Sequence, residues 1–90
     1  VWDRIQESIM MSLRLTEEGV NLDDFHARYG IPLQSLFGEQ VQRFTTRGLL
    51  KYSENGKHLR LTKRGRLLGN QVFLEFIGNE IPRGYEYLNL

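Results

Sequence analysis

The 90-residue sequence contains no cysteine, which removes disulfides, thiolate metal ligands, a cysteine nucleophile and a cysteine-held iron–sulfur cluster from this chain. Its apolar runs are only a few residues long, far below the roughly twenty residues that span a bilayer. No basic-then-apolar leader opens it. These absences predict a soluble domain without a membrane span, in the cytoplasm or, in a eukaryote, in an organelle stroma or matrix.

The residues that are present describe an ordinary globular domain. Hydrophobic side chains make up 40% of the chain and charged side chains 26%, proportions that fit one hydrophobic core. Val1 falls inside an amphipathic segment rather than before one. We therefore expect further sequence to precede this domain in the natural protein.

The net charge of +1 conceals a strong division along the sequence. Residues 1–40 carry three basic and seven acidic groups, whereas residues 41–70 carry eight basic groups and a single acidic one, Glu54. Residues 71–90 carry one basic and three acidic groups. Asymmetry of this kind bears on partners rather than on fold, and it predicts that the central stretch faces an acidic partner or water.

Hydrophobic periodicity predicts three helices in the first half of the chain. The first ends near Gly19, the second is capped by Asn21 and ends before Gly30, and the third runs from Pro32 to Gly48. The buried stripe of the first helix consists of Trp2, Ile5, Ile9 and Leu13. That of the third consists of Leu33, Leu36, Phe37, Val41 and Phe44.

Alternation replaces helical spacing in the next segment. Residues 50–52 and 59–61 alternate between apolar and polar, and Asn55-Gly56 between them predicts a two-residue hairpin turn. Thr62 is a suitable N-cap for a fourth helix, whose broad apolar face we expect to be largely covered. Residues 78–90 have no clean period, so we expect this tail either to dock or to fray.

The predicted fold class is mainly α with a small β-hairpin, in the winged-helix-like order helix, helix, helix, hairpin, helix. No linker or internal repeat divides the chain. We therefore expect one domain over residues 1–77, followed by a C-terminal tail over residues 78–90.

No group of residues has the spacing of a catalytic or metal site. His26 and His58 lack metal-spaced or catalytic companions, so we interpret both as exposed polar residues. The segment KRGRLLG, which contains Gly65 and Gly69, lacks the spacing of a phosphate-binding loop and predicts close packing at a helix start instead. We therefore predict no catalytic, cofactor-binding or metal-ligating residue in this chain.

Basic residues gather where a DNA-binding winged helix would use them, at the end of the third helix, along the hairpin and at the start of the fourth helix. They are Arg43, Arg47, Lys51, Lys57, Arg60 and Lys63. Before Arg43, however, the third helix offers mainly uncharged polar residues and the repelling Glu39, and the net charge of +1 is small for a nucleic-acid binder. Nucleic-acid binding is therefore the less favoured alternative to a solvated basic face.

Two segments of the sequence resemble a known family. The first is LRLTEEGVNLDDF, from Leu13 to Phe25, and the second is GLLKYSENGKHLRLTKRGRLLGNQVF, from Gly48 to Phe73. Together they are similar to the C-terminal domain of the oxygen-independent coproporphyrinogen III oxidase-like proteins. The first segment looks more like the haem-chaperone branch of that family than the oxidase branch.

The resemblance implies an accessory domain of a radical S-adenosylmethionine protein in haem and porphyrin metabolism. In such a parent protein, a catalytic barrel binds a 4Fe–4S cluster through cysteines, binds S-adenosylmethionine, and holds the porphyrin substrate or haem. None of those cluster or cofactor residues has a counterpart in this chain. The resemblance therefore implies that the parent performs the chemistry, as a coproporphyrinogen dehydrogenase-like enzyme or a haem carrier, and that this domain alone is inactive.

The partner that the resemblance implies is the catalytic barrel of the parent protein. Arg14, Arg64 and Arg66 are candidates to meet carboxylates on that barrel, or the propionates of a porphyrin or haem. A DNA-binding winged helix and a generic protein-interaction module are the alternatives that the residues leave open.

Overall fold

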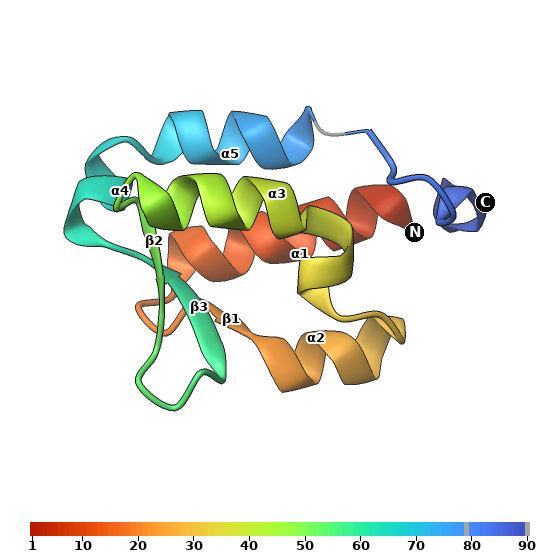
Figure 1. Ribbon diagram of the computed structural model, residues 1–90, viewed down its shortest axis with the longest axis horizontal. Coiled ribbons are helices and arrows are strands. Elements are labelled where there is room, and N and C mark those ends of the chain that lie inside the picture. The colour runs from red at the N-terminus through yellow and green to blue at the C-terminus, as the bar shows by residue number, and fades with distance from the viewer. Residues whose placement is uncertain (79, 90) are drawn as a thin grey trace.

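A computed structural model describes residues 1–78 and 80–89; residues 79 and 90, which belong to the predicted tail, lie outside the described residues. The elements, in chain order, are α1 (Trp2–Leu15), β1 (Val20–Asn21), α2 (Leu22–Tyr29), α3 (Leu33–Thr46), β2 (Leu50–Tyr52), β3 (His58–Leu61), α4 (Lys63–Leu67), α5 (Gly69–Ile77) and the 3-10 helix η1 (Glu86–Asn89). Figure 1 shows α1, α3 and α5 lying along the long axis, with the β2–β3 hairpin at one end and both chain ends at the other. The predicted class, mainly α with a small β-hairpin, is confirmed.

Two predicted helix starts carry the side-chain caps that the sequence indicates. Asn21 Oδ1 accepts a hydrogen bond from the backbone N–H of Asp24 at 3.0 Å, which caps α2. Thr62 Oγ1 accepts one from the backbone N–H of Gly65 at 2.9 Å, which caps α4. Each cap satisfies an amide at the helix start that has no partner within the helix.

Two helices that periodicity predicts as continuous are interrupted. Within α3 the backbone of Phe37 is non-helical, with φ −128° and ψ 23°. The predicted fourth helix divides into α4 and α5 at Leu68, with φ −110° and ψ 23°. The Phe37 ring stacks on Trp2 with ring centroids 5.3 Å apart, and it meets Phe76 edge-on at 5.2 Å. Tertiary packing of this kind overrides helical propensity, and a periodic pattern does not reveal it.

The hairpin is part of a three-stranded antiparallel sheet in the order β1-β3-β2. Strand β1 is only two residues long, so no alternating pattern predicts it, and it forms by pairing Val20 with Leu59 and Asn21 with His58. This strand joins the segment between α1 and α2 to the hairpin. The sheet therefore contains one strand more than the sequence indicates.

The connection between β2 and β3 is longer than the two-residue turn that Asn55-Gly56 predicts. The Ser53 N–H donates to the His58 carbonyl at 2.9 Å, so the loop consists of the residues between these two. A type I′ turn needs positive φ at both central residues, but among the described residues only glycines have positive φ, including Gly56 at 72°. The Asn55 carboxamide oxygen instead accepts from the Ser53 hydroxyl at 2.7 Å, which stabilises the wider loop.

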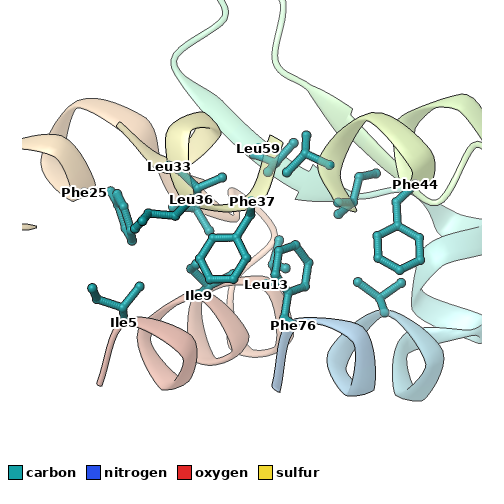
Figure 2. Close-up of a cluster of buried hydrophobic side chains, with 14 of the residues drawn as sticks. Ile5, Ile9, Leu13, Phe25, Leu33, Leu36, Phe37, Phe44, Leu59 and Phe76 are labelled. Atoms are coloured by element: carbon teal, nitrogen blue, oxygen red, sulfur yellow. The ribbon is translucent and has the colours of Figure 1, made fainter. Parts of the chain in front are cut away.

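The core lies where α1, α3 and α5 meet the sheet. Figure 2 shows Ile9 and Leu13 of α1 beside Phe37 of α3 and Phe76 of α5, all of them fully buried. Leu88 of η1 is 5% exposed and belongs to the same hydrophobic cluster. This part of the tail therefore docks on the core.

Gln6 is a buried polar residue of α1, with 6% exposure, and it fixes α5 against α1. Its side-chain Nε2 donates to the carbonyl oxygens of Phe76 and Ile77 at 2.7 and 2.8 Å. Carbonyls in the last turn of a helix have no partner within the helix, so these two bonds satisfy the end of α5. They fix the end of α5 against the buried side of α1.

Candidate functional site

Exposed apolar side chains gather on α1, α4 and α5. The exposed large hydrophobic residues of these helices are Met11, Leu15, Leu67, Leu68, Leu74 and Ile77. Exposure reaches 85% at Leu67, 69% at Leu15 and 67% at Leu74. Single exposed leucines are common on protein surfaces and need no explanation. A group of them on neighbouring helices is typical of a surface that another domain or protein covers.

Two predicted docking arginines lie within this group. Arg14, from the last turn of α1, and Arg66, from α4, line one cavity together with Leu67 and Phe73. Arg66 Nη2 also donates to the Thr16 carbonyl at 3.3 Å, which holds its guanidinium beside the end of α1. A second groove, along the outer side of α1, is lined by Glu7, Met10, Met11, Arg14 and Leu15.

Arg14 belongs to both hollows and therefore links the two helices into one surface. We term this surface the apolar–basic face. Its residues along the two hollows are Met11, Arg14, Leu15, Arg66 and Leu67. We include Leu74 and Ile77, which line neither hollow but are exposed on α5, the helix that packs against α1.

The third predicted docking residue, Arg64, is placed differently. It is exposed on α4, but it does not line the cavity that Arg14 and Arg66 share. Residues 64 and 66 are two positions apart on a helix, and such residues do not face the same direction. The structure thus brings together two of the three predicted arginines.

The broad apolar face that the sequence predicts for the fourth helix is covered only in part. Val72 and Phe76 are fully buried, whereas Leu74 is 67% and Ile77 48% exposed within this chain. In the sequence, Leu74 and Ile77 were therefore signalled by an apolar stripe that is wider than the part of the helix that the core buries. Their exposure depends on how α5 packs against α1 and α3.

The basic residues that were predicted as a nucleic-acid-binding patch do not form one continuous surface. Arg43 Nη1 lies 2.7 Å from Glu75 Oε2, so this cation already pairs α3 with α5. Gln34 and Glu39 of α3 line a cavity together with Glu80, which follows α5. Two carboxylates beside the helix that would enter a groove repel phosphates, which disfavours DNA docking through α3.

The remaining members surround the sheet. Arg47, Lys51, Lys57 and Lys63 are exposed, and Arg60 is half-buried on β3. Lys51 and Arg60 are paired directly opposite each other across β2 and β3. These cations lie on or next to β2, β3, the end of α3 and the start of α4, elements that Figure 1 shows at one end of the domain.

Other candidate residues lie apart from both surfaces. His26 is exposed on α2, and His58 is half-buried on β3. Within residues 1–78 and 80–89, no group of three histidine, cysteine, aspartate or glutamate residues could hold a metal ion. In the same part of the chain, no helix has the length and hydropathy needed to cross a membrane.

Gly65 packs closely against a neighbour, as its context predicts. A Cβ at this position would overlap the carbonyl oxygen of Leu49, at the start of the hairpin. At Gly69, by contrast, a Cβ would meet only the Phe73 ring of the same helix, at 3.2 Å. Gly65 therefore joins α4, which carries Arg66, to the segment that leads into β2.

Comparison with known proteins adds a family to this geometry. Residues 1–68 match the HemN C-terminal domain family. The chain is 37% identical over 76 residues to the Heme chaperone HemW of Bacillus subtilis (strain 168), and 30% identical over 78 residues to the Heme chaperone HemW of Lactococcus lactis. These matches cover 84% and 87% of this chain but 19% and 20% of the relatives, so the chain spans about a fifth of their length. No solved structure matches the chain.

Proposed function

Since this chain belongs to the HemN C-terminal domain family, we propose that it is an accessory domain of a haem-related protein and packs through the apolar–basic face on the catalytic barrel of that protein. Residues 1–77 form the domain and residues 78–90 its tail. The haem-chaperone branch is favoured because both relatives bear that name. The cytoplasm is the proposed compartment.

In this proposal the chemistry belongs to the rest of the parent protein. A 4Fe–4S cluster needs thiolate ligands, and this chain contains no cysteine to supply one. The cluster, S-adenosylmethionine and haem would therefore be held by the barrel. The domain itself contributes binding surface and no catalytic group.

The observation that carries the proposal is the exposure of Leu67, Leu74 and Leu15 on adjoining helices. Removing a leucine side chain fully from water stabilises a contact by about 1.5–3 kcal/mol, so covering several of them is a substantial driving force. Arg14 and Arg66 line the same hollows as Leu15 and Leu67 and would pair with carboxylates on the barrel or with porphyrin propionates. Charge pairs of this kind fix orientation more than they add affinity.

The proposal is tested with Leu74→Glu in the full-length parent protein. Gln42→Glu is the matched control, because Gln42 is an exposed residue of α3, outside the apolar–basic face, and acquires the same charge. We expect Leu74→Glu to raise hydrogen exchange in α5 at least about tenfold in the parent, since a carboxylate cannot be buried against the barrel without a partner. In the 90-residue chain, where Leu74 is already 67% exposed, thermal unfolding should change little.

Equal exchange in the two parent variants would contradict docking through this face. The arginines are tested in the same way, with Arg14→Gln/Arg66→Gln compared with Arg64→Gln. Loss of domain association and of haem binding is expected only in the double variant, because Arg64 does not share the cavity of the other two.

A further inference from the structure

The exposed face of the sheet carries two cations directly opposite each other. Lys51 of β2 is in register with Arg60 of β3. Leu59 and Leu61 on either side of Arg60 are buried, so Arg60 projects from the other face, where Lys51 is exposed. Opposed residues on one face of an antiparallel pair have Cβ atoms about 5 Å apart, and like charges there destabilise the sheet.

No carboxylate within the described residues neutralises this pair. The ion pair within the described residues joins Arg43 of α3 to Glu75 of α5 and involves no strand residue. Arg60 Nε is buried and has no hydrogen-bond partner, so a ligand on the exposed face would have to contact the terminal guanidinium nitrogens. Lys51 and Arg60 thus form a like-charge pair that lacks a compensating anion.

The start of the Arg60 side chain is held in place by the backbone beside it. Gly19 precedes β1 and has φ 80°, and a Cβ there would lie 2.7 Å from Arg60 Cα and 2.8 Å from Arg60 Cβ. Only a glycine allows this close approach. The segment before β1 therefore packs directly against the backbone and Cβ of Arg60, which fixes where its side chain leaves the sheet.

Protection of a sheet edge accounts for only one of the two cations. In the order β1-β3-β2, the strand β2 is an edge, and a lysine on an edge strand discourages pairing with other chains. Arg60 lies on the central strand β3, where edge protection is not needed. A neutral residue at this position would remove the repulsion, so the arginine calls for another explanation.

We propose that Lys51 and Arg60 bind the phosphate of a phosphate monoester on the exposed face of β2–β3. An arginine fork and a lysine ammonium are the two side chains that bind phosphate oxygens through charge-assisted hydrogen bonds. A phosphate monoester carries close to two negative charges at neutral pH, so one group compensates both cations. A single carboxylate or an isolated phosphodiester group carries one charge and leaves the other cation uncompensated.

The test is a titration of the isotopically labelled 90-residue chain with phenyl phosphate, followed by NMR at constant ionic strength. The Arg60 Nε–H signal reports on the guanidinium group, whose terminal nitrogens would contact the phosphate. We expect saturable shifts of this signal and of the Lys51 amide, with a dissociation constant at least about tenfold lower than for benzoate, which has the same ring and a single charge. A thymidine oligonucleotide without terminal phosphates should bind more weakly than phenyl phosphate at 0.15 M salt.

Lys51→Glu separates binding from stability, with Lys57→Glu as the matched control on the same hairpin. Lys51→Glu turns a like-charge pair into an opposite-charge pair, so Tm should rise by about 2–6 °C while phenyl phosphate binding falls at least about tenfold. Lys57→Glu should weaken binding less than about threefold, because Lys57 lies in the loop outside the Lys51–Arg60 register.

Three results would overturn the proposal: equal weakening by Lys57→Glu, benzoate or the oligonucleotide binding as tightly as phenyl phosphate, or no saturable shift at Arg60. Docking through the apolar–basic face is not affected by any of these results, because that face involves neither Lys51 nor Arg60.

Discussion

The two basic surfaces of this domain place their cations in different surroundings. On the apolar–basic face, Arg14 and Arg66 flank exposed leucines, whereas on the sheet Lys51 and Arg60 face each other. An apolar surrounding offers a docking partner the gain from dehydration, and the arginines then set its orientation. An isolated cation pair offers attraction over little area, far below the area of a stable protein interface. The kind of partner therefore depends on the neighbours of the charges rather than on their number.

Helix α4 connects the two surfaces, because Gly65 packs against the Leu49 carbonyl just before β2. The largest effect is expected from a substitution that disrupts this contact. Gly65→Ala would place a Cβ against the Leu49 carbonyl and 3.2 Å from the Leu61 side chain. Because backbone must move to relieve this overlap, we expect a loss of about 3 kcal/mol in the free energy of unfolding, measured by urea denaturation. Both surfaces should then show faster hydrogen exchange.

Gly38→Ala in α3 is the control for this substitution, since a Cβ there meets nothing within 4 Å. It should be neutral or stabilise the chain by up to about 1 kcal/mol through helix propensity. Similar destabilisation by both alanines would mean that close packing at Gly65 does not join the two surfaces.

A smaller effect is expected from Gln6→Leu, which should sharpen the comparison by disturbing one surface only. This change leaves the carbonyls of Phe76 and Ile77 without the Gln6 donor at the end of α5. We expect a loss of about 2 kcal/mol in unfolding free energy and faster exchange in α5, with the hairpin unchanged. Equal acceleration in β2 and β3 would show that the two regions do not open separately.

The smallest effect is expected at the Arg43–Glu75 ion pair, which joins α3 to α5 outside both surfaces. Its side chains are 49% and 39% exposed, so solvent screens the attraction. A double-mutant cycle with Arg43→Ala and Glu75→Ala should give a coupling energy of about 0.2–1 kcal/mol that decreases in 1 M salt. A coupling above about 2 kcal/mol would indicate that this pair, rather than Gln6, fixes α5.

Local signals in the sequence predicted much of the fold because they act over a few residues. Asn21 and Thr62 cap the helices that they were expected to cap, since each side chain reaches an amide three residues ahead. The buried stripes of α1 and α3 also follow from helical spacing. Strand β1 and the break at Phe37 depend on contacts with distant segments, so no local pattern predicted them. The length of the hairpin loop depends on the local Ser53–Asn55 side-chain hydrogen bond, which the Asn-Gly dipeptide alone does not specify.

For the candidate sites, the sequence by itself determined the charges, the excess apolar width of residues 67–77 and the family resemblance, because these depend only on which residues follow one another. Tertiary structure alone decided that Arg14 and Arg66 line one cavity that Arg64 does not line, and that Leu74 remains exposed. It also decided that Lys51 faces Arg60. Exposure and strand register are set by long-range packing, and a shift of one residue in register would move every side chain to the opposite face.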